Sequence, residues 1–249
     1  MERFGTEDVD GDGFSNNISI ADMTAISLYQ AQLSVPGRVI HRHPRIEAAV
    51  SNGEKLFMDI GCGDCHIPSL PLTDGGWHYV EPNPFNPPGN LQPGDAPDFS
   101  MDLNDPELEQ PRLEVDRKDN AVWVPAFTDF KVFDITEGPD APNCEPIDMN
   151  APRSSPDFFE GNCRFLTKRL WGLANQPPYF HHGLFTTMRE AIEAHRGDAI
   201  ESYHAWKELD DYGRDAIIEF LKTLQVLPPD TDTLIVDERF RPRQWNDSF

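Results

Sequence analysis

The sequence is poor in basic residues, and this limits the partners that it can bind. Its 249 residues include 21 Lys and Arg against 43 Asp and Glu, which gives a formal net charge of −22. Phosphate groups are bound by basic surfaces, so we expect no nucleic-acid partner, and anionic membrane surfaces are disfavoured for the same reason. Long apolar runs are lacking too. No stretch approaches the roughly 18 apolar residues that span a bilayer, so we predict no transmembrane segment.

The N-terminal segment lacks the features of an export signal. Residues 1–13 read MERFGTEDVDGDG, without a basic region followed by an apolar region. Read literally, this start predicts a cytoplasmic protein. Cysteine is also scarce, because the chain contains four: Cys62, Cys65, Cys144 and Cys163.

Helical periodicity dominates the regular part of the sequence. The expected elements are helices at 21–33, 44–60, 186–195 and 210–224, with a small hairpin formed by 112–115 and 121–127. Most of the 23 prolines fall in residues 71–160, which predicts long proline-rich connections there. The patterns therefore predict a mainly α fold.

The motif that carries chemistry is Cys62-Gly-Asp-Cys65-His66. A C-x-x-C-H sequence is the attachment signature of c-type haem, because two thiols on one turn meet the two porphyrin vinyl groups and the next imidazole faces the iron. A thioredoxin-like redox pair would need a preceding strand, which the pattern does not predict. A zinc site would need four ligands, and Cys144 and Cys163 lack the second short spacing. We predict one covalent haem c at Cys62 and Cys65, with His66 as the proximal iron ligand.

Covalent haem attachment conflicts with the missing export signal, because it takes place outside the bacterial inner membrane. We therefore expect a periplasmic or otherwise extracytoplasmic protein. Its sequence is expected to be a C-terminal fragment, or to come from a gene model that begins too late. In an oxidising compartment, Cys144 and Cys163 are expected to form a disulfide. The alternative is a pair of unrelated buried thiols.

Several segments of the chain resemble the bacterial di-haem oxidoreductases, putative peroxidases similar to the di-haem cytochrome c peroxidases. The resemblance is carried, in order, by residues 4–13, by 53–57 with 62–68, by 165–173, by 178–183 and by 187–192. It implies two cytochrome c-like domains with one haem each, whereas this chain has one C-x-x-C-H. The chain looks like the C-terminal, electron-transfer half. The N-terminal half, which would bind peroxide, is missing, so we assign no catalytic residue and no complete active site.

The resemblance also implies the fold and the domain boundaries. We expect a cytochrome c-like domain over 36–249, with an insertion at about 67–160 and a small β-hairpin within it. Residues 1–35 are expected to form a packing extension that consists of an acidic loop and a helix. The expected partner is the missing N-terminal haem domain or a redox protein.

The second axial ligand follows from the resemblance as well. In the peroxidases that the sequence resembles, this ligand lies about four helical turns beyond the Pro-Tyr-Phe-His segment, and 14 residues beyond His181 lies His195. His195 shares one apolar helix face with Met188 and Ile192, so its ring is expected to point inward. We predict a bis-histidine haem, with Met188 as the rival ligand.

Two further residues are assigned to the haem surroundings. His181 lies in a Phe-His-His-Gly turn where the family often has His-Asp-Gly, and we assign it to the haem-binding residues. Arg169 is predicted to reach a haem propionate, because guanidinium binds carboxylate in a bidentate manner. The alternatives are a turn that only packs against the haem edge for His181 and a surface ion pair for Arg169.

Residues 8–19 resemble the front of a calcium-binding loop. Carboxylates stand at loop positions 1, 3 and 5, and Gly13 stands at position 6, where such loops turn sharply. Position 12 is Ser19 instead of Glu. The predicted Ca²⁺ ligands are Asp8, Asp10, Asp12, the carbonyl of Phe14, Asn16 and Asp22. The alternative is an acidic turn that caps the following helix.

Three functions are compatible with these features. The first, which we favour, is the haem c electron-transfer domain of a di-haem peroxidase-like oxidoreductase. The second is a stand-alone mono-haem cytochrome c that carries electrons without catalysis. The third is a calcium-binding module whose C-x-x-C-H carries no haem.

Overall fold

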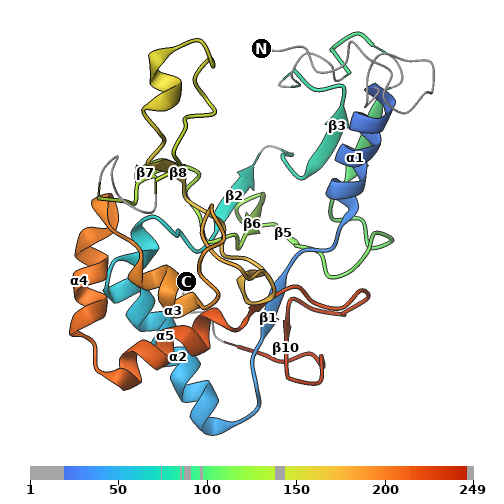
Figure 1. Cartoon of the computed structure of the whole chain (residues 1–249). Coiled ribbons are helices and arrows are strands. Elements are labelled where there is room, and N and C mark those ends of the chain that lie inside the picture. The colour runs from blue at the N-terminus through green and yellow to red at the C-terminus, as the bar shows by residue number, and fades with distance from the viewer. Residues whose placement is uncertain are drawn as a thin grey trace.

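The computed structural model describes residues 20–245 except 74, 85, 87–90, 96–97 and 138–143. Its helices are α1 (Ile20–Gln32), α2 (Pro44–Asp59), α3 (Met188–Glu193), α4 (Ile200–Glu208) and α5 (Asp211–Leu221). Its longer strands are β1 (Gly37–Val39), β2 (Leu70–Thr73), β3 (His78–Glu81), β4 (Phe99–Asp102), β6 (Ala121–Val124), β7 (Val132–Asp134) and β8 (Arg164–Leu166). Three strands have two residues each: β5 (Val115–Asp116), β9 (Leu224–Gln225) and β10 (Ile235–Val236). Figure 1 shows α2 to α5 gathered at one end of the molecule.

The predicted fold class, a mainly α cytochrome c-like domain, is wrong. Helices account for 31% of the described residues and strands for 17%. The strands form two three-stranded sheets, β10-β1-β9 and β2-β6-β5, and two two-stranded sheets, β3-β4 and β7-β8. The helical patterns hid this content because strands of two to four residues are too short to show an alternating pattern.

The four predicted helical segments correspond to α1, α2, α3 and α5, and the hairpin is present as well. In this hairpin, β5 pairs antiparallel with β6, with Val115 opposite Val122. Helix α3 ends at Glu193, so His195 lies beyond it and not on its face as expected. Helix α4 was not predicted. Helix α4 buries one residue fully, Trp206. The sequence of this helix therefore lacks the apolar stripe that reveals an amphipathic helix.

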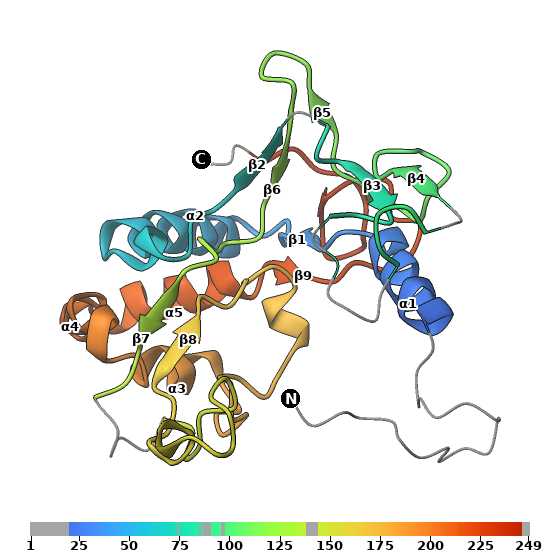
Figure 2. The same cartoon turned by 90° about the horizontal axis from the view of Figure 1, so that it is seen from above.

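The close crossing of α2 and α5 organises the helical part of the fold (Figure 2). At the crossing, Gly53 lies so near α5 that a Cβ placed on it would come within 1.9 Å of the Ala216 carbonyl oxygen. Around this point Phe57, Phe127 and Phe220 pack with their ring centroids 5.4 to 6.4 Å apart. These rings belong to the main core cluster, which also contains Trp206, Ile217, Leu221 and Leu224.

A buried ion pair joins β1 to the same helix pair. The Arg38 guanidinium donates from Nη1 and Nη2 to the two Glu54 carboxylate oxygens, at 2.8 and 3.1 Å. The Glu54 side chain is 1% exposed, and Arg38 also lies over the Phe220 ring. Because both charges are withdrawn from water, loss of one partner would leave the other uncompensated, at a cost of about 3–5 kcal/mol.

A second buried carboxylate holds the C-terminal segment. Asp237 has no exposed surface, and it accepts hydrogen bonds from the side chains of Arg241 and Arg42 and from the backbone N–H of Arg239. These donors, with the Arg241 hydrogen bond as the largest cause, hold the pKa of Asp237 far below its ordinary value.

We expect Gly53→Ala to lower the free energy of unfolding by about 3 kcal/mol. The new methyl group meets backbone atoms of α5, which cannot rotate away, so the helices must separate. The gain in helix propensity, about 1 kcal/mol, does not offset this clash. Urea unfolding would measure the loss. Ser51→Ala, an exposed change on the same helix, is the control, and equal stability of the two variants would contradict this account.

We expect Asp237→Asn to lower the melting temperature by several degrees at pH 7. The folded-state pKa is below the unfolded value of about 3.9, so the charged carboxylate stabilises the fold above this pH and loses its effect as the pH falls through the folded pKa. The difference in melting temperature between the variant and the wild type should therefore narrow below about pH 4. Melting curves over pH check this, with exposed Asp232→Asn as the control. A gap that does not depend on pH would show that the charge is not responsible.

Candidate functional site

The C-x-x-C-H motif forms a tight turn directly after α2. Gly61 takes a left-handed conformation (φ 85°) that reverses the chain, and a short 3-10 helix follows over Cys62–Asp64. The backbone N–H of His66 donates to the carbonyl of Cys62 at 3.0 Å. Both thiols and the imidazole therefore lie on one compact turn at the edge of the main core.

The two cysteines of this turn are protonated thiols that are not joined to each other. Cys62 packs against the main core, and this burial raises its pKa to about 12. Burial also raises the pKa of Cys65, and the nearby carboxylates of Asp129, Asp64 and Asp198 raise it further. An active redox pair or a thiolate metal site requires lowered thiol pKa values. In this turn both thiol pKa values are raised, which disfavours either role.

His66 is held in a defined orientation and charge state. Its Nδ1 lies 3.0 Å from the carbonyl oxygen of Phe127, which accepts from it, and the backbone of Lys168 also hydrogen-bonds to the ring. Burial lowers the pKa of His66 to about 4, with the charge of His195 as the next cause. The ring is therefore neutral at pH 7, which is the form that binds a metal ion.

The backbone at Phe127 is unusual, and it aims this carbonyl. Phe127 has a left-handed φ of 53°, which bulky residues rarely adopt. The conformation is kept in place by the burial of the Phe127 ring and by hydrogen bonds from the N–H groups of Phe127 and Thr128 to the carbonyls of Pro68 and Ile67. Strained residues of this kind cluster at functional sites. Sequence reasoning missed the role of Phe127, because a backbone carbonyl leaves no signal in the side-chain pattern.

His195 is prepared in the same way as His66. Its Nδ1 lies 2.8 Å from the carbonyl oxygen of Ala191, and burial lowers its pKa, so this ring is also neutral with a lone pair on Nε2. The edge-on ring of Phe180 packs against it at 5.3 Å. A charge on His195 would lower the pKa of His66, although 128 residues separate the two in the sequence.

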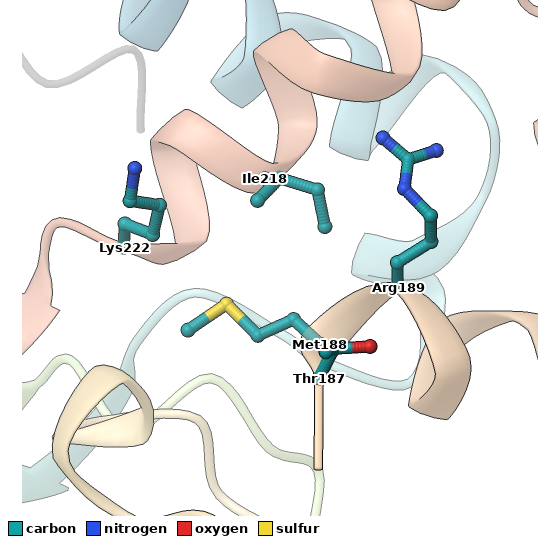
Figure 3. A pocket seen from close by; sticks show the side chains of 5 residues that line it. All are labelled: Thr187, Met188, Arg189, Ile218 and Lys222. Carbon is teal, nitrogen blue, oxygen red and sulfur yellow. The ribbon is translucent and has the colours of Figure 1, made fainter. Parts of the chain in front are cut away.

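Met188, the rival ligand, lines a cavity of about 390 Å³ between α3 and α5. The other lining residues are Thr187, Arg189, Ile218 and Lys222. Figure 3 shows the Met188 side chain extending across this cavity towards Lys222. Met188 also contacts the main core, so its side chain has a packing role in this fold.

Cys144 and Cys163 form a disulfide, which confirms the predicted pairing. It closes the base of an excursion, coloured yellow in Figure 1, which contains the 3-10 helix η2 (Pro156–Phe159) and projects beyond β7 and β8. The disulfide removes the two cysteines that a zinc site would require. Within the described ranges, no three His, Cys, Asp or Glu side chains form a group that could hold a metal ion.

His181 and Arg169 are the other two residues that were predicted to bind the haem. The His181 ring stacks on Phe165 with centroids 3.7 Å apart, and its Nε2 is 3.6 Å from a Glu145 carboxylate oxygen. Phe180 contacts both His181 and His195, so the Phe-His-His-Gly turn lies beside His195. Arg169 is exposed.

The predicted calcium loop lies almost entirely outside the described residues. This applies to Asp8, Asp10, Asp12, Phe14 and Asn16. Asp22 is described, and it lies in the first turn of α1 with its side chain exposed.

None of the helices among the described residues has the length and apolar character needed to cross a bilayer. No protein-family model, no curated protein and no solved structure matches the chain.

Proposed function

We propose that this chain is a haem c electron-transfer domain that works in a di-haem peroxidase-like oxidoreductase of the periplasm. The observation that carries the proposal is a buried, neutral His66 on the same turn as two free thiols, with a second buried histidine, His195, acting on it electrostatically. Each imidazole is buried and neutral, and each donates from Nδ1 to a backbone carbonyl.

The donor set fits a covalently held haem. Cys62 and Cys65, which are both free thiols, would form the two thioether bonds, each adding its S–H across one vinyl group. His66 and His195 would supply the axial nitrogens. The Phe127 and Ala191 carbonyls would then act as outer partners that fix each ring and raise its basicity as a ligand.

The residues of this chain would determine which chemistry the haem performs. A bound haem iron supplies a one-electron redox centre. Two histidine ligands leave no open position for peroxide, so the domain would pass electrons and would not activate a substrate. Bis-histidine ligation also favours the ferric state more than His–Met ligation does, which predicts a reduction potential below that of a His–Met carrier. The substrate-activating haem would belong to the partner half.

The covalent attachment is tested by expressing the chain behind an export signal together with the haem-maturation machinery. We expect Cys62→Ala/Cys65→Ala to lose all covalent haem, since no thioether can form. Haem staining of a denaturing gel makes the measurement. The matched control is Cys144→Ala/Cys163→Ala, which removes the disulfide cysteines and should keep the stain. Staining that survives loss of Cys62 and Cys65 would refute the attachment site.

The axial ligand is tested on the same haem-loaded protein. We expect His195→Ala to convert a six-coordinate low-spin ferric spectrum to a high-spin one, because iron loses its distal nitrogen. Met188→Leu, a change of similar volume in helix α3 just before His195, should leave the spectrum unchanged. A sulfur-to-iron charge-transfer band in the wild type, or a low-spin spectrum that persists in His195→Ala, would assign the position to another residue.

We also propose that the acidic loop before α1 binds Ca²⁺. The supporting observation is the alternating oxygen-ligand pattern at Asp8, Asp10, Asp12 and Asn16. Millimolar Ca²⁺ should raise the melting temperature relative to a chelator, because the unfolded chain lacks the site. Asp10→Asn/Asp12→Asn should abolish this increase, whereas the exposed change Asp232→Asn should not. Identical melting curves with calcium and with chelator would show that the loop does not bind Ca²⁺ and only caps the following helix.

A further inference from the structure

Three carboxylate side chains are almost fully buried among the described residues, and they belong to Glu54, Glu81 and Asp237. Glu54 is paired with the Arg38 guanidinium, and Asp237 accepts hydrogen bonds from two arginine side chains. Such pairing is expected, because burial of an ionised carboxylate is costly unless a positive charge balances it. Glu81, which is 4% exposed, is the exception.

The groups that bond to Glu81 are all neutral. Its Oε1 accepts from the Tyr79 hydroxyl at 2.6 Å and from Asn83 Nδ2 at 3.4 Å, and its Oε2 accepts from Asn86 Nδ2 at 2.5 Å. No Lys, Arg or His of the described residues forms an ion pair with Glu81. The positions of this part of the chain that lie outside the described residues, namely 74, 85, 87–90 and 96–97, hold no basic residue either. A cation beside this carboxylate would therefore be strongly favoured.

Further oxygen atoms lie next to the Glu81 carboxylate. Asn86 Nδ2 donates to the Leu91 carbonyl at 2.9 Å, and Asn83 Nδ2 donates to Asn86 Oδ1 at 2.7 Å. An Asn amide that turns by 180° about its last bond keeps its shape and exchanges its nitrogen for its oxygen. The oxygens of Asn83 and Asn86 would then face Glu81, with the Leu91 carbonyl next to them. We refer to Tyr79, Glu81, Asn83, Asn86 and Leu91 as the Glu81 cluster.

The Glu81 cluster joins separate elements of the fold. Glu81 ends β3, where it stands opposite Phe99 of β4, and Tyr79 hydrogen-bonds to Ser27 of α1. Burial and the hydrogen bond to Glu81 raise the pKa of Tyr79 to about 12, so the phenol keeps its proton and remains a donor. Both views show β3 beside α1, away from the helices α2 to α5 (Figures 1 and 2). A ligand of the cluster would therefore stabilise this part of the molecule and would not reach the C-x-x-C-H turn.

We propose that the Glu81 cluster binds Ca²⁺, and that its ligands are the Glu81 carboxylate, the side-chain oxygens of Asn83 and Asn86 and the Leu91 carbonyl. Ca²⁺ takes six to eight oxygen ligands of these types, and water would complete the set. Mg²⁺ fits less well, because it demands near-ideal octahedral geometry and sheds its water reluctantly. With one charged ligand, the site should be weak, with a Kd on the order of 10⁻⁴ to 10⁻³ M. It is distinct from the acidic loop before α1, and it does not depend on the haem.

The test is a calorimetric titration of the whole chain with CaCl₂ after treatment with a chelator. It uses an Asp10→Asn/Asp12→Asn background, so that the acidic loop before α1 contributes no binding. We expect one site, and Glu81→Gln should raise its Kd at least about tenfold, because the change removes the charged ligand and keeps its shape. The matched control is Glu107→Gln, the same change at an exposed glutamate, and it should leave Kd unchanged.

A second variant distinguishes a calcium site from a network of hydrogen bonds. Asn86→Asp adds a carboxylate ligand, so we expect Kd to fall about tenfold. In chelator this variant should melt below the parent, because two carboxylates then face each other, and millimolar Ca²⁺ should raise its melting temperature more than that of the parent. A hydrogen-bond network without a cation would instead lose the same stability with and without calcium.

Several results would overturn the site. One is the absence of binding heat in the background chain, and another is a Kd that Glu81→Gln leaves unchanged. If Glu81→Gln does not fold, a Kd that Asn86→Asp fails to lower would be decisive. A response to Mg²⁺ as strong as that to Ca²⁺ would refute the choice of cation. The haem stain and the ferric spectrum should be the same in calcium and in chelator, so this inference and the proposed function are tested separately.

Discussion

The contact of α2 with α5 at Gly53 is the constraint on which the rest of the molecule depends. Because the missing side chain lets the two backbones touch, the apolar faces of both helices meet, and the rings of Phe57 and Phe220 come into edge contact. Arg38 reaches Glu54 across the same junction, which ties the small β1 sheet to the helices. Since the C-x-x-C-H turn begins immediately after α2, the position of this helix determines where both thiols and His66 lie.

The site itself is assembled from distant segments by backbone groups. Phe127 supplies a carbonyl from the proline-rich connection, and Ala191 supplies another from α3. Each selects the tautomer of one histidine without a charged side chain. Burial keeps both rings neutral, because it lowers the pKa of each histidine by more than these carbonyl hydrogen bonds raise it.

The sequence predicted local features better than it predicted their assembly. The helices at α2 and α5 have clear apolar periodicity, and the pairing of Cys144 with Cys163 followed from their number. Strands of two to four residues carry too little pattern, so the sheets were missed and the helical content was overestimated. His195 was selected through a resemblance, since a single histidine on an apolar helix face is ambiguous. The carbonyl of Phe127 could not have been found, because its role depends on a left-handed backbone angle.

The disulfide at the base of the 144–163 excursion has a consequence for the integrity of the chain. Cys144 and Cys163 are joined at the point where the excursion leaves the body of the protein. A protease that cuts a peptide bond between them therefore produces a nick and not two separate molecules. The segment that carries Cys62 and His66 stays covalently linked to the segment that carries His195, and the two part only when the sulfur bridge is reduced as well.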